Sequence, residues 1–168
     1  MNGGSPIPMA TLTFKGIDEY VAKLDQAEKQ IKGIMKRALY DGAGILADEV
    51  RKEIQALPVQ KANPPPGEQL NGVFGYEKEG LLNGLGVAKM REYEGNIQTR
   101  IFFDGYNRMK SKKYPNGHPN ALIARSINAG TSVRAKIPFL NRAVSKAKAR
   151  FEAAVKARFE SDLDKIMK

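Results

Sequence analysis

The chain has 168 residues, 42% of them hydrophobic, which is enough for one domain with its own core. It has no cysteine and a single histidine, which excludes disulfides and the thiolate and multi-histidine ligand sets of common metal sites. The formal net charge is +10, and no apolar run reaches the roughly 18 residues of a membrane span, so we expect a soluble protein without a membrane partner.

The N-terminal third predicts a short leader and then a long helix. Residues 1–10 lack the charged and apolar regions of a signal peptide, and we expect a flexible leader there. The alternation in Thr11–Lys15 is typical of a short strand. Apolar residues then recur at helical spacing from Asp18 to Leu57. Gly33 and Gly42–Gly44 predict a bend or a break into two helices, or alternatively close packing against another element.

A proline-rich insertion follows this helix. Leu57-Pro58-Val59 ends the helix, and Pro64-Pro65-Pro66 removes backbone donors and restricts φ. We expect an irregular loop at about residues 58–79, poorly ordered in a free subunit and cut first by proteases near Lys61 or Lys78. A contact with a neighbouring subunit is the alternative role for a loop of this length.

The middle of the chain predicts a β-hairpin, a basic loop and a short helix. Leu85–Met90 and Asn96–Phe103 are typical of strands, joined by a turn that contains Glu94 and Gly95. The loop Tyr106–Gly117 contains proline and glycine, which disfavour regular structure. A short helix is predicted over Pro119–Ile127, and its inward residues are expected to be Leu122, Ile123 and Ile127.

The last segment predicts a long amphipathic helix that begins at Pro138. We expect fraying after about Phe159 unless a partner packs there, because the acids near the C-terminus oppose the helix dipole. The residues expected in the core are Phe139, Leu140, Val144 and Phe151. The cations expected on the opposite face are Arg142, Lys146 and Arg150.

Positive charge is concentrated in one part of the chain. Residues 105–151 contain eleven Lys and Arg and no Asp or Glu, whereas the remainder has 17 basic and 18 acidic residues. Such segregation favours a polyanionic partner or channel, and the alternative is a solvated surface. Tyr106 and Tyr114 beside the basic loop could stack on bases, but we favour a role in bracing the loop.

No catalytic constellation emerges from the residues. His118 lies in a loop between Gly117 and Pro119, and Gly84-Leu85-Gly86 lacks the third glycine of a dinucleotide fingerprint. We therefore expect no enzymatic activity, no catalytic or cofactor-binding residues, no cofactor and no metal.

Two stretches resemble the minor tail-component proteins of long-tailed phages, of the head–tail joining or tail-completion type. The first is Asn128–Thr131 followed by Ile137–Leu140 and Ala143, with Asn128 where that family usually has an acid. The second is Leu57–Val59 and then Gly80–Leu82, separated here by an insertion of about twenty residues. The resemblance implies that the motif residues Gly130, Thr131, Pro138, Phe139 and Leu140 are structural.

The resemblance covers the order of elements from about Leu12 to Phe159. It implies an α+β fold, with a long N-terminal helix, whole or broken, a small antiparallel sheet and a long C-terminal helix packed together, and we expect residues 11–168 to form this single domain. It implies a virion protein of the neck or tail, made in the bacterial host cytoplasm. As a hexameric or dodecameric ring, it would join the head connector on the portal side to the tail tube or tail terminator, with packaged double-stranded DNA passing through.

Six cations are then expected to face the DNA channel or a partner, namely Arg108, Lys110, Lys112, Lys113, Arg134 and Lys136. The main alternative is a sequence-nonspecific nucleic-acid-binding protein that uses residues 105–151. A toxin-like or nuclease domain is disfavoured by the missing catalytic residues.

Overall fold

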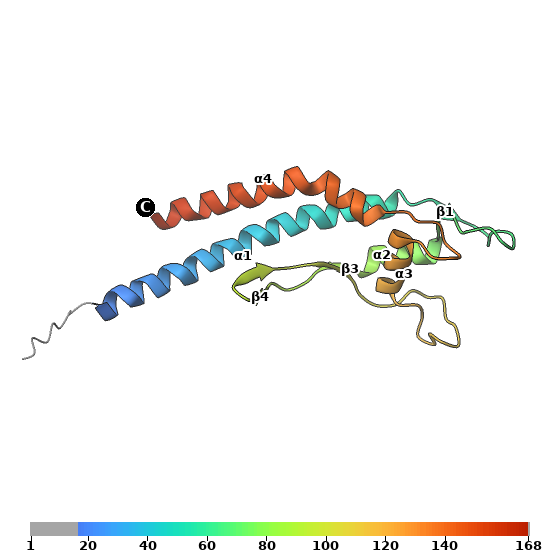
Figure 1. The fold of residues 1–168 in the computed structure, drawn as a ribbon, viewed down its shortest axis with the longest axis horizontal. Coiled ribbons are helices and arrows are strands. Elements are labelled where there is room, and N and C mark those ends of the chain that lie inside the picture. Colours follow the sequence, from blue (N-terminus) through green and yellow to red (C-terminus); the bar gives the residue numbers. More distant parts are fainter. Residues whose placement is uncertain (1–16, 168) are drawn as a thin grey trace, which may run out of the picture.

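An α+β fold of two long helices, two short helices and three small two-stranded sheets is seen in the computed structural model, which describes residues 17–167 (Figure 1). The predicted leader and the strand at Thr11–Lys15 lie outside the described residues. Within residues 17–167, no helix combines the length and apolarity needed to cross a bilayer.

Helices α1 (Ile17–Gln55) and α4 (Phe139–Met167) lie side by side and antiparallel (Figure 1). The glycines do not break α1. Instead, Gly42 lets α4 come close, because a Cβ there would lie 2.7 Å from Val155 Cγ2 and 2.8 Å from Phe151 Cε2. Gly44, two residues further along α1, faces open space. The packing interpretation of this small-residue stretch is therefore confirmed at Gly42.

The two glycines give opposite expected effects on stability. Gly42→Ala should lower the free energy of unfolding by up to about 2 kcal/mol, since overpacking costs about 1–3 kcal/mol and the better helix propensity of alanine returns about 1 kcal/mol. Gly44→Ala should raise it by about 0.5–1 kcal/mol, because only the propensity changes. Urea denaturation of both variants measures this, and a shift of both in one direction would contradict the packing.

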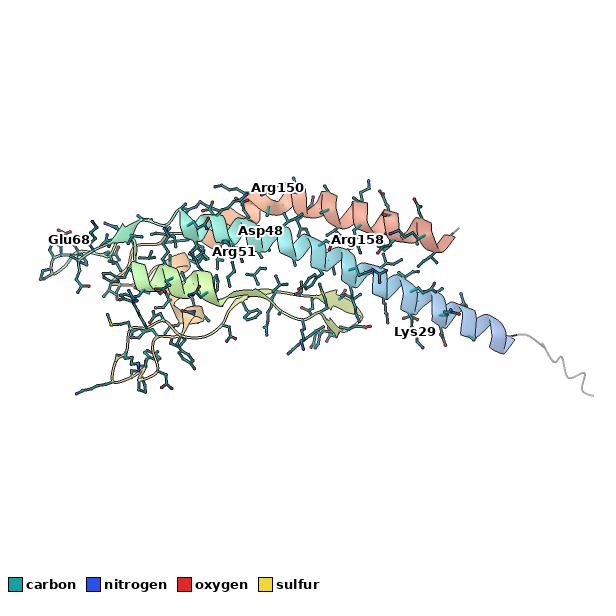
Figure 2. All side chains as sticks on the ribbon, turned by 180° about the vertical axis from the view of Figure 1, so that it is seen from behind. Lys29, Asp48, Arg51, Glu68, Arg150 and Arg158 are labelled. Carbon is teal, nitrogen blue, oxygen red and sulfur yellow. The ribbon has the colours of Figure 1, made fainter. Side chains whose placement is uncertain are left out.

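Ion pairs connect the two long helices along their length. Arg142 and Lys146 of α4 donate to Glu53 of α1 at 2.8 and 2.6 Å, and Arg150 reaches Glu49 at 2.5 Å. The prediction that these cations lie opposite the packed face is therefore wrong. They turn toward α1 because it presents two largely buried carboxylates one turn apart. Figure 2 shows Arg150 and Arg158 on α4, alongside α1.

The expected fraying after Phe159 is not seen in the structure, because α4 continues to Met167. Asp162 is 5% exposed and accepts hydrogen bonds from Arg37 of α1 at 2.9 Å, from Lys165 at 3.0 Å and from Arg158 at 3.1 Å. These donors hold the pKa of the Asp162 carboxyl well below its usual range. The acid near the helix end is thus compensated by one cation of α1 and two of α4 itself.

Asp162→Asn is expected to destabilise the protein near neutral pH, and the difference from wild type should shrink as pH falls below about 4. A carboxyl whose folded-state pKa is depressed contributes stability above its unfolded-state pKa and loses that contribution as pH falls through the folded-state pKa. Thermal melts between pH 7 and acid measure this, with Asp164→Asn, an exposed carboxylate nearby, as the control. A difference that grows toward acid would contradict this account.

The proline-rich loop is shorter than expected. Strand β1 (Val59–Gln60) pairs in parallel with β2 (Val73–Phe74), and α2 (Gly75–Gly84) follows directly, so the irregular part ends at Gly72. Lys78 is therefore helical and donates to the carbonyls of Gln55 and Leu57 at 2.5 and 3.1 Å. It thereby satisfies backbone acceptors at the end of α1.

The predicted hairpin is confirmed, in two interrupted parts. The outer pair is β4 (Arg91–Tyr93) with β5 (Asn96–Gln98), and the inner pair is β3 (Leu85–Val87) with β6 (Ile101–Phe103). Positive φ angles of 49° at Glu94 and 78° at Gly95 suit the tight turn between them. The hairpin lies along α1 (Figure 1), and an ion pair joins them, with Glu92 Oε1 at 3.0 Å from Lys32 Nζ.

The core lies where α1, α2, α3 (Asn120–Ala129) and the start of α4 meet. Phe139 is fully buried as predicted, while Leu140 and Phe151 are half-buried. Two predictions are wrong, because Val144 is 53% exposed and Leu122 is 42% exposed. Each lies one position away from the line of buried residues on its helix. Those lines are Phe139, Ala143 and Ala147 on α4, and Ile123, Ala124 and Ile127 on α3.

Candidate partner-binding and DNA-facing surface

The basic loop Tyr106–Gly117 is closed at its base by hydrogen bonds. Tyr106 and Pro119 form an antiparallel bridge, and the Asn107 N–H donates to the His118 carbonyl at 2.9 Å. The Asn107 side-chain oxygen accepts from the N–H groups of Met109 and His118 at 3.0 and 3.3 Å. An asparagine that is only 4% exposed thus organises a segment with little regular structure.

The tip of the loop is held by Ser111 and Tyr114, whose backbones exchange hydrogen bonds at 3.1 Å. The Tyr114 ring lies 4.9 Å from the His118 ring, and the Lys113 ammonium lies 5.5 Å from the Tyr114 ring centre. Tyr114 therefore braces the loop, as predicted, whereas Tyr106 is 60% exposed.

Four cations project from this braced loop. Arg108, Lys110, Lys112 and Lys113 are all exposed. Arg108 approaches Glu79 only at 4.0 Å, and within residues 17–167 the three lysines have no carboxylate within 4.0 Å. The loop therefore carries positive charge that the described part of the chain does not neutralise. In Figure 1 it projects at one end of the molecule, below α2 and α3.

The motif segment joins α3 to α4. Gly130, with φ of 77°, ends α3, and a turn at Thr131–Arg134 follows. The Asn128 side-chain oxygen accepts from the Leu140 N–H at 3.0 Å, in the first turn of α4. Asparagine and aspartate both accept such bonds, so Asn128 does here what an acid could do at the same place. Pro138 immediately precedes the helix.

Arg134 is not a surface residue, which corrects its predicted place among the partner-facing cations. It is 8% exposed, donates to Glu77 at 2.6 Å and donates to the Gly72 carbonyl at 3.0 Å. This ion pair, with the backbone bonds of Leu70 to Val133 and Ala135 at 2.9 Å, attaches the end of the proline-rich loop to the connector. Lys136, by contrast, is exposed beside Gly130.

Sequence reasoning missed the polar groups behind the basic loop and a second set of cations. Asn107 Nδ2 and Asn120 Oδ1 have no hydrogen-bond partner among the described residues, although both side chains are buried.

The second set of cations lines a large groove beside the hairpin and consists of Lys89, Arg91, Arg100 and Arg125. Their proximity depends on the hairpin folding against α3, which no local pattern reveals. No cluster of three or more His, Cys, Asp or Glu side chains suited to a metal ion occurs within residues 17–167.

Comparison of the chain with protein-family models, with curated proteins and with solved structures finds no match.

Proposed function

We propose that this chain is a structural protein of a phage neck, which forms a ring and joins the head connector to the tail tube. The observation that carries the proposal is the braced basic loop with four exposed and largely unneutralised cations. A channel that passes duplex DNA should hold it loosely and without reading its sequence, and exposed Lys and Arg supply such contacts. The motif at Asn128–Leu140 gives independent support through its resemblance to tail-completion proteins.

Charge reversal of the loop tests the proposal. In a phage that depends on this chain, replacing Arg108, Lys110, Lys112 and Lys113 by Glu should leave heads joined to tails but make DNA retention or ejection abnormal. The physical reason is that the lumen would then repel the phosphate backbone. Electron microscopy of particles and a DNA-release assay give the readouts. A matched control reverses four exposed lysines elsewhere, at Lys36, Lys61, Lys148 and Lys156.

Two outcomes would change the assignment. If joining fails while the variant remains folded, the loop docks on an acidic surface of the connector or tail terminator. If joining, retention and ejection all match the control variant, the loop has neither role, and the proposal loses its main support.

Sequence-nonspecific nucleic-acid binding by the free chain is the second candidate, favoured by the exposed ring of Tyr106 beside Arg108. Each phosphate contact contributes about −0.9 to the slope of log K against log salt for duplex DNA. Loss of four loop cations should therefore make that slope shallower by about four. Affinity that is unchanged by the loop reversal would reject this candidate.

A further inference from the structure

One face of the β-hairpin carries side chains that do not belong to the core. In β6, Phe103 packs against the core, so its neighbour Phe102 lies on the opposite face, because side chains alternate along a strand. Steps of two along the same strand place Arg100 and Gln98 on the face of Phe102.

The first strand of the hairpin adds two residues to this face. Arg91 is paired directly with Gln98, and residues opposite each other in an antiparallel pair share a face. Tyr93 follows Arg91 by two residues, whereas Glu92 between them turns to Lys32 of α1. We call the resulting set the hairpin face, and its members are Tyr93, Arg91, Gln98, Arg100 and Phe102.

An aromatic ring lies at each end of the hairpin face. The Tyr93 side chain is 63% exposed and that of Phe102 is 38% exposed. The Phe102 ring lies across Gly86, where a Cβ would come within 2.8 Å of Phe102 Cζ. Neither ring stacks on another aromatic ring within residues 17–167. Both rings therefore offer π surface to a ligand.

The charge between and beside these rings has one sign. Arg91 and Arg100 are exposed, and with Lys89 and Arg125 they line a groove of about 1280 Å³ whose lining includes no carboxylate. Among the described side chains, none of these four cations has a carboxylate within 4.0 Å. This surface therefore favours an anionic ligand.

Open rings with cations between them suit a single-stranded nucleic acid. Unpaired bases stack on aromatic rings whatever their sequence, while the backbone phosphates contact Lys and Arg. A duplex keeps its base faces within its own stack, and an acidic peptide offers carboxylates but no flat ring of the kind that two exposed aromatics would stack on. From Gly86, beneath the Phe102 ring, to Tyr93 the strand runs about 23 Å, which accommodates about four or more nucleotides.

We propose that the hairpin face binds single-stranded nucleic acid, DNA or RNA. The Tyr93 and Phe102 rings stack on bases, and the four cations contact phosphates. This inference goes beyond the neck function, which requires only loose contact with duplex DNA, and it does not rest on that function. It also uses residues that lie outside the basic loop.

Two variants test the two kinds of contact. Y93L/F102L removes stacking, because leucine keeps an apolar side chain but has no flat ring, and R91Q/R100Q removes two phosphate contacts. The matched controls change exposed residues outside the hairpin face, namely Y40L and K36Q/K148Q. Circular dichroism verifies that each variant keeps its secondary structure.

Fluorescence anisotropy with labelled probes measures the affinity between about 50 and 200 mM salt. The probes are oligo(dT) and oligo(U) of about fifteen nucleotides, a DNA duplex of the same length and polyglutamate. Because the chain has no tryptophan, quenching of its tyrosine fluorescence gives a second readout of stacking at Tyr93.

Y93L/F102L should bind single strands at least about tenfold more weakly than wild type, while its affinity for the duplex stays within about twofold. R91Q/R100Q should make the slope of log K against log salt shallower by about 1.4, since each phosphate contact on a single strand contributes about −0.7. Both controls should bind as wild type does. The tighter of the two oligonucleotides identifies DNA or RNA as the ligand.

Three results would overturn the proposal. They are a wild type that binds neither oligonucleotide at about 50 mM salt, equal single-strand affinity of wild type and Y93L/F102L, and polyglutamate binding as tight as that of oligo(dT). The last result would assign the face to an acidic protein segment instead.

The loop reversal described above separates this surface from the basic loop. In that background, Y93L/F102L should lower single-strand affinity by the same factor as in the wild-type background. If the factor disappears, single strands bind to the loop and the hairpin face is not the site. Neither outcome affects the neck function, which is judged by joining and DNA release in particles.

Discussion

Arg134→Ala is expected to lower the free energy of unfolding by about 3–5 kcal/mol, because removing one partner of a buried ion pair leaves the other charge without compensation. The charge left behind is Glu77, which is 4% exposed. The Gly72 carbonyl would also lose its donor, so the proline-rich loop should separate from the connector. Chemical denaturation gives the magnitude, and limited proteolysis near Lys61 reports the loosened loop.

Two further variants separate burial from charge. Lys136→Ala removes an exposed cation two residues away and should change stability by no more than about 0.5 kcal/mol. Replacing the pair together, as R134M/E77L, should recover much of the loss, since apolar groups of similar volume often substitute for a buried pair. Equal effects of the changes at Arg134 and Lys136 would contradict the buried pair.

Phe139→Ala is expected to cost about 3–5 kcal/mol, the range for truncating a buried aromatic side chain. Phe139 is fully buried, and its ring centre lies 6.3 Å from that of Phe103. Thermal or urea unfolding measures the loss. Phe102→Ala is the control. Phe102 precedes Phe103 in β6 and is 38% exposed, so its truncation should cost less than half as much free energy as that of Phe139. Similar losses at the two positions would contradict this core.

Helices and turns with strong local signals could be predicted from the sequence. The spacing of apolar residues indicated α1 and α4, and Glu94-Gly95 between two apolar runs indicated the hairpin. Helix α2 was missed because glycine-rich segments favour loops. Its glycines serve packing instead, since a Cβ at Gly80 would lie 2.5 Å from Asn120 Oδ1.

The candidate site was only partly predictable, because charge pairing depends on distant residues. Arg134 and Lys136 are both cations in the same short connector, and the neighbouring residues do not distinguish them. Arg134 is nevertheless buried, because its partner Glu77 lies 57 residues earlier in the chain. The helical spacing predicts Arg142, Lys146 and Arg150 on the face opposite the apolar stripe, because their pairing with Glu49 and Glu53 depends on the register of α1 against α4, which no local pattern reveals. The loop cations were easier to place, because a loop bounded by proline and glycine tends to project from the surface.

The ion pairs between α1 and α4 have a consequence for how a subunit approaches its target. They offset positive charge in the middle of the molecule, while the basic loop keeps its unpaired charge at one end (Figure 1). A subunit with charge separated along its long axis experiences a torque in the field of a polyanion. It should therefore rotate during diffusion so that the loop arrives first, which increases the fraction of productive encounters at low ionic strength.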